Sequence, residues 1–125
     1  MVMIFANKKV REYLLEHWLV YTYRKNHKKT ADGIRPQTGK DWATDKRTGG
    51  KIADIFITPM EAIDSQNMRQ VLIKYVRTSG FYRPSYYDIY MDESVSDWAK
   101  AINSLNPFAP RAGWIYRVEV REAEG

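Results

Sequence analysis

Two hydrophobic periodicities share this chain of 125 residues, and a chain of that length holds one hydrophobic core but not two. Apolar residues recur every three to four positions over residues 8–17 and 94–105, which predicts two helices that each bury one side. Asn7 is a suitable N-cap for the first helix, and Ser94 with Asp97 three residues on resembles a capping box for the second. Such helices, combined with strands around one core, predict an α+β fold.

Strands are predicted where apolar and polar side chains alternate, the pattern of a strand with one buried face. Residues 18–24 and 51–58 are rich in β-branched and aromatic side chains, and the alternation over residues 114–120 is unbroken. Residues 65–78 fit both periodicities. Gly80 lies where the residue just beyond a helix end would be, and this favours a helix over 65–78.

Positive charge is concentrated in residues 24–51, which we call the basic segment. The segment holds nine Lys or Arg and three Asp, a net charge of +6, whereas the whole chain carries +5. The remainder of the chain therefore sums to about −1, so one region of the surface is expected to be positive. Five glycines and prolines interrupt any regular periodicity, so most of the segment is predicted to be a loop between the flanking strands.

Aromatic residues accompany these charges: Trp42 lies within the segment, and Tyr21 and Tyr23 precede it. Cations that neutralise phosphates and rings that stack on bases are the two components of a single-stranded nucleic-acid site. The competing interpretations are a solvated loop for the charges and a packing anchor for Trp42. The candidate nucleic-acid-binding residues are Tyr21, Tyr23, Arg24, Lys25, Lys28, Lys29, Arg35, Lys40, Trp42, Lys46, Arg47 and Lys51.

Several features are absent from the sequence, and their absence excludes some classes of function. It has no cysteine, which removes disulfides, thiol catalysis and thiolate metal sites. His17 and His27 lie in different predicted elements without carboxylates at ligand spacing, so no metal or other cofactor is expected. No stretch approaches the roughly 18 apolar residues of a membrane span, so we expect no membrane partner and a soluble, cytoplasmic protein. Without a linker or repeat, one domain is expected over residues 1–125, with a solvated tail at residues 122–125.

Five stretches together resemble the ASCH domains of the PUA-like superfamily over about two thirds of the chain. They are WLVYTYR at 18–24, RTGGKIADIFI at 47–57, TSGFY at 78–82, ESVSDWAKAINSLN at 93–106 and GWIYRVEV at 113–120. The resemblance implies a PUA-like curved β-barrel flanked by helices, in which the glycine-phenylalanine turn precedes a helix with a characteristic Trp and the last strand closes the barrel.

The same resemblance implies a function. ASCH-like domains bind nucleic acid, RNA in preference to DNA, in a cleft beside the barrel, and a few resemble amidohydrolases that act on an acylated cytidine. The enzyme-like members carry a lysine, a threonine three residues on and a distant glutamate. Lys29 stands at the lysine position here, but Asp32 lies three residues on and Thr30 is adjacent, so binding is preferred to catalysis.

The tyrosine-rich residues 81–91 supply a third alternative, a surface for a protein partner. The second half of residues 82–91 is predicted to form a short edge strand. Among the tryptophans, Trp98 and Trp114 lie on apolar stripes and are expected to be buried, whereas Trp42 lies among charges and is expected to be exposed.

Overall fold

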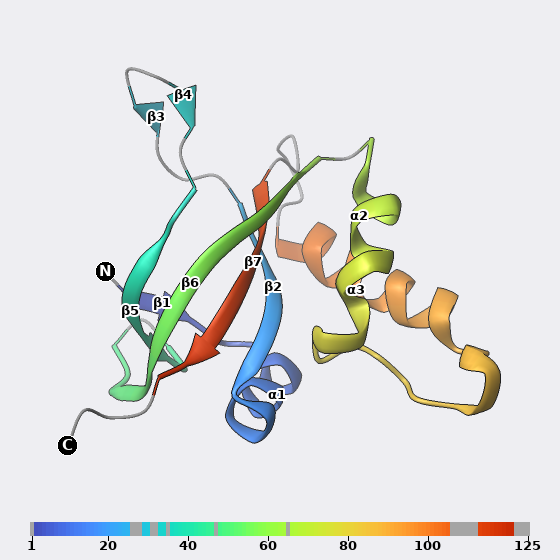
Figure 1. Ribbon diagram of the computed structural model, residues 1–125, viewed down its shortest axis with the longest axis horizontal. Coiled ribbons are helices and arrows are strands. Elements are labelled where there is room, and N and C mark those ends of the chain that lie inside the picture. Colours follow the sequence, from blue (N-terminus) through green and yellow to red (C-terminus); the bar gives the residue numbers. More distant parts are fainter. Residues whose placement is uncertain are drawn as a thin grey trace.

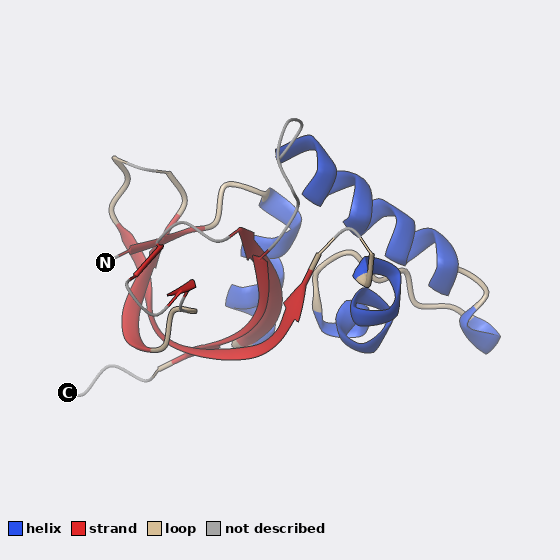
Figure 2. Ribbon diagram, turned by 90° about the horizontal axis from the view of Figure 1, so that it is seen from above, coloured by secondary structure: helices blue, strands red, loops and turns tan. Residues whose placement is uncertain are grey.

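The computed structural model describes residues 2–25, 29–30, 33–34, 36–46, 48–64, 66–105 and 113–121. Five strands form one sheet in the order β1-β5-β6-β7-β2, and the sheet curls into an open barrel (Figures 1 and 2). The strands are β1 (Val2–Ile4), β2 (Leu19–Lys25), β5 (Gly39–Thr44), β6 (Lys51–Ile63) and β7 (Gly113–Val120). The pairing of β1 with β5 is parallel and the others are antiparallel. A separate two-stranded ladder joins β3 (Lys29–Thr30) to β4 (Gly33–Ile34).

The inner side of the curl is apolar because alternate residues of each strand point into it. These inward residues form one core cluster that includes Val20, Ala43, Ile55, Ile57, Tyr116 and Val118. The alternation predicted for residues 114–120 therefore holds. Tyr116 and Val118 are buried in this cluster, and Trp114 is only partly buried against it.

Helix α1 (Lys8–His17) adds Val10 and Leu14 to the inner cluster and lies at the lower end of the sheet in Figure 1. Its predicted N-cap is confirmed: the Asn7 Oδ1 atom accepts hydrogen bonds from the backbone N–H groups of Lys9 and Val10, at 2.9 and 3.3 Å. The helix ends at Trp18, which has a left-handed backbone (φ 61°) and a half-exposed side chain.

Two further helices cover part of the outer side of the sheet. Helix α2 (Met68–Tyr75) continues into a 3₁₀ turn, η1 (Val76–Thr78), and α3 is Met91–Leu105. Their apolar faces meet the outward residues Tyr23, Ile63 and Ile115 in a second core cluster, which also holds Leu72, Val95, Trp98 and Ile102. The α+β class and a curved sheet flanked by helices are thus confirmed, as is a helix rather than a strand within residues 65–78.

Gly80 fixes how η1 passes α1. Its φ of +90° lies in the left-handed region, and a Cβ atom there would stand 3.0 Å from the carbonyl oxygen of Lys9. Only a residue without a side chain fits such a close backbone approach. Gly80 was predicted to lie just beyond the end of a helix. It lies beyond the end of η1, not directly beyond α2.

Two strand predictions need correction. Most of the basic segment was expected to be loop, but Gly39–Thr44 forms β5, which pairs with both β6 and β1. The strand predicted to end at Thr58 runs on to Ile63. Pro59 does not end it because the register shifts between Pro59 and Glu61, and an irregularity of this kind tolerates a residue that lacks an N–H group.

The region before α3 also differs from expectation. Instead of an edge strand, residues 82–91 hold a 3₁₀ turn, η2 (Tyr86–Asp88), and α3 begins at Met91. Ser94 is therefore inside the helix and is not its cap. The Ser94 hydroxyl donates to the carbonyl of Tyr90 at 2.8 Å and accepts from the N–H group of Arg83 at 2.9 Å, so it joins the segment before η2 to the start of α3.

Candidate nucleic-acid interface

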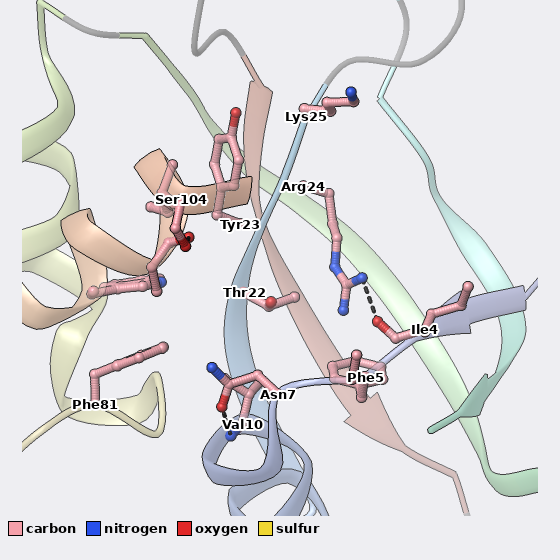
Figure 3. Close-up of a pocket in the computed structure, with 14 residues that line it drawn as sticks. Ile4, Phe5, Asn7, Val10, Thr22, Tyr23, Arg24, Lys25, Phe81 and Ser104 are labelled. Atoms are coloured by element: carbon pink, nitrogen blue, oxygen red, sulfur yellow. Dashed lines mark hydrogen bonds between the residues drawn. The ribbon is translucent and has the colours of Figure 1, made fainter. Parts of the chain in front are cut away.

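A cleft of about 560 Å³ opens beside β2, where the two edge strands of the sheet come together (Figure 3). One wall is the connection from β1 into α1, residues 4–7, and the second is β2 itself. The third wall is formed by Phe81 and by α3, from Trp98 to Ser104. The cleft therefore lies between the barrel and its helical layer.

Arg24 connects the two edges of the sheet. From β2 its Nη1 atom donates a hydrogen bond to the carbonyl oxygen of Ile4 in β1, as Figure 3 shows. The guanidinium carbon lies 4.7 Å from the centroid of the Phe5 ring, a cation–π distance. Burial lowers the pKa of Arg24 to about 10, and the group remains charged at neutral pH. Within the described part of the chain, the Arg24 Nε atom has no hydrogen-bond partner.

Tyr116 shares the interior of the curl with Arg24. The N–H group of Gln37 donates to the Tyr116 hydroxyl at 2.9 Å. Burial is the main reason that the pKa of Tyr116 is raised, and the positive charge of Arg24 acts in the opposite direction. The neutral phenol therefore persists across the physiological pH range. None of the described residues that line the cleft is acidic, so Arg24 has no carboxylate neighbour among them.

The helical wall is aromatic and apolar. The rings of Phe81 and Trp98 are nearly parallel, with an interplanar angle of 13° and centroids 6.3 Å apart. Trp98 is 3% exposed and Phe81 is partly buried, so Phe81 presents more of its ring to the cleft. Lys25, which is exposed, stands at the opposite side of the opening (Figure 3). The cleft thus combines an apolar wall with one cation in its interior, Arg24, and one at its mouth, Lys25.

The predicted site residues do not gather in one place. Tyr23, Arg24 and Lys25 line the cleft. Tyr21 packs on Tyr75 of α2, with ring centroids 5.0 Å apart, so its ring is engaged within the protein.

The other candidates lie elsewhere. Lys40 and Trp42 are exposed on β5, and Lys46 is exposed just after it. Lys51 forms an ion pair with Asp54 at 3.1 Å. Lys28, Arg35, Arg47 and the side chain of Lys29 lie outside the described residues.

The other residues that line the cleft were missed as site residues, among them Asn7, Phe81 and Trp98. Asn7 was recognised as a helix cap and Trp98 as a core residue, and both assignments hold. Nothing in their local sequence marks them as cleft residues, because they reach the cleft only through the packing of α1 and α3 beside β2.

Comparisons with protein-family models, curated proteins and solved structures found no match for this chain. Among the described residues, no group of three or more His, Cys, Asp or Glu side chains is placed to hold a metal ion. The helices in this part of the chain are all too short or too polar to cross a membrane.

Proposed function

We propose that this protein is a PUA-like domain that binds single-stranded nucleic acid, RNA in preference to DNA, and that the cleft beside β2 takes one nucleotide. The observation that carries the proposal is the position of Arg24 and Lys25. These first two cations of the basic segment stand at an apolar cleft with an aromatic wall. A volume of about 560 Å³ lies within the range of small-ligand sites.

The chemistry of the cleft matches the two parts of a nucleotide. A base is a flat ring that gains free energy by stacking on an aromatic side chain, and Phe81 offers a ring. A phosphate is an anion that a guanidinium or ammonium group binds strongly when water is excluded. Arg24 is partly buried beside Phe5, so few water molecules solvate its charge. A phosphate that binds there would supply the anionic partner and hydrogen-bond acceptors that water does not.

The amidohydrolase alternative has less support. General acid–base catalysis needs a titratable side chain within hydrogen-bond reach of the substrate, most often His, Asp or Glu and less often Lys or Tyr. Among the described residues that line the cleft there is no Asp, Glu or His, and the polar side chains are those of Asn7, Thr22, Tyr23, Arg24, Lys25 and Ser104. Release of the acid from an N4-acylated cytidine at an appreciable rate would favour the enzyme over the binding module.

The test is the affinity for a fluorescent uridine decamer, measured by anisotropy at several salt concentrations. Each phosphate contact is expected to contribute about −0.7 to the slope of log K against log salt, so about four contacts give roughly −3. Lys25→Ala should make this slope shallower by about 0.7. Phe81→Ala should weaken binding by about 1–3 kcal/mol and leave the slope unchanged.

Lys74→Ala is the matched control, since Lys74 lies on α2 and is paired with Glu61 at 2.9 Å, away from the cleft lining. It removes the same charge from the protein and should leave the slope unchanged. A wild-type slope near zero, or equal effects of Lys25→Ala and Lys74→Ala, would exclude the cleft as the phosphate-binding site.

A further inference from the structure

Two large aromatic side chains are exposed on the outer side of the sheet. Trp42 on β5 is 37% exposed and Phe56 on β6 is 40% exposed. Their strand neighbours Ala43, Ile55 and Ile57 are buried in the inner cluster, so alternation directs both rings outward. A single exposed aromatic residue is ordinary, but a pair on one sheet face needs an explanation.

The two rings are close neighbours. In the pairing of β5 with β6, Trp42 lies opposite Asp54 and Lys40 lies opposite Phe56. Trp42 and Phe56 are therefore diagonal neighbours on one face, about 7–8 Å apart at their backbones, which is within reach of aromatic side chains. Together they form a small platform, which we call the outer platform.

The charge beside the outer platform suits a phosphate backbone. Lys40 is exposed directly opposite Phe56 and has no ion-pair partner within the described part of the chain. The neighbouring carboxylates are neutralised: Asp54 pairs with Lys51 at 3.1 Å, and Glu119 pairs with Arg117 at 3.2 Å. The uncompensated charge on this face is therefore positive.

The outer platform is also continuous with the cleft. Strand β1 borders the cleft at Ile4, and on its other side it pairs with β5, with Val2 opposite Trp42. Neighbouring strands lie about 4.8 Å apart, so the outer side of β5 is about one strand spacing from β1 and that of β6 about two, roughly 10 Å. A chain that leaves the cleft over β1 reaches Trp42 before Phe56.

We propose that a bound RNA single strand leaves the cleft across β1 and continues over the outer side of β5 and β6, where its bases stack on Trp42 and Phe56. The inference rests on the proposed function and adds the path of the strand beyond the cleft. Rings on an open sheet face beside a free cation are a recurrent way to hold unstacked bases without reading their sequence. The site is thus longer than one nucleotide and wraps one edge of the barrel.

Two ligands of different length test this path: uridine monophosphate, which fits the one-nucleotide cleft, and a uridine decamer, which can extend to the outer platform. Trp42→Ala and Phe56→Ala should each weaken decamer binding roughly 5- to 150-fold and change binding of the monophosphate less than about twofold. Trp42→Phe, which keeps a ring, should retain most of the decamer affinity. Lys25→Ala should weaken binding of both ligands, because it acts at the cleft.

Trp18→Ala is the control, because Trp18 is 52% exposed but does not line the cleft or lie on β5 or β6. If Lys25→Ala weakens binding while Trp42→Ala and Phe56→Ala behave like Trp18→Ala, the path over β1 is wrong and the cleft proposal stands. The exposed rings would then fit a protein contact instead. If neither the monophosphate nor the decamer binds the wild-type protein, the proposed function fails and this inference fails with it.

Discussion

Replacing Trp98 by alanine should lower the free energy of unfolding by about 3–5 kcal/mol, as is usual for the loss of a buried large aromatic side chain. Trp98 is 3% exposed, belongs to the outer-side core cluster and stacks against Phe81. Its removal leaves a cavity between α3 and the sheet and takes away the support of the cleft's aromatic wall. Urea denaturation, followed by circular dichroism, measures the change.

Trp18→Ala is a suitable comparison, because it deletes the same side chain from a half-exposed position. We expect its effect to stay below about 1 kcal/mol. If Trp98→Ala does not fold, Trp98→Phe should still show an intermediate loss of stability. Equal stability losses for Trp98→Ala and Trp18→Ala would contradict the packing of α3 described above.

Arg24→Met should separate nucleic-acid binding from stability. The substitution removes the hydrogen bond to Ile4 and the contact of the guanidinium with Phe5. It also removes a charge that burial disfavours, as the lowered pKa of Arg24 indicates, and methionine fills a similar volume. These effects oppose each other, so we expect the free energy of unfolding to change by less than about 1 kcal/mol. Affinity for RNA should fall about 10- to 100-fold, the value of a charge-assisted contact to phosphate.

Arg11→Met is the matched control for Arg24→Met. Arg11 also donates from its Nη1 atom to a backbone carbonyl near the cleft, that of Phe5 at 3.1 Å, but it does not line the cleft. The Arg11 variant should retain RNA affinity. Unchanged RNA affinity in Arg24→Met, or a similar loss in both variants, would contradict a direct role for Arg24.

The elements that could be predicted from the sequence are those whose signals are local. Asn7 caps α1 with its own side chain, and the alternation of β7 reflects a strand with one face in the inner core. Strand β5 gives a weaker local signal, because only Ala43 and Thr44 of its six residues are buried. Its conformation depends on pairing with β6 and β1, which are distant partners that the local pattern does not contain.

The candidate site could be predicted only along β2. Because successive residues of a strand face opposite sides, Arg24 turns into the curl whereas Tyr21 packs on α2, although the two lie in one basic and aromatic stretch. The aromatic wall comes from Phe81 and Trp98, more than 50 positions further along the chain. Their approach to β2 follows from the packing of α3, which the sequence of either segment alone does not specify.

Mapping of backbone amide chemical shifts by NMR, with a uridine trimer added to the ¹⁵N-labelled protein, tests the central proposal most directly. If the cleft binds nucleotides, the largest shifts should fall at residues 4–7, 10, 22–25, 81, 98, 101, 102 and 104, which line it. The amides of η2, where Tyr86 and Tyr87 are the most exposed aromatic residues of the described chain, should shift little. Shifts concentrated at η2, or none at the cleft at a saturating concentration of the trimer, would contradict the account.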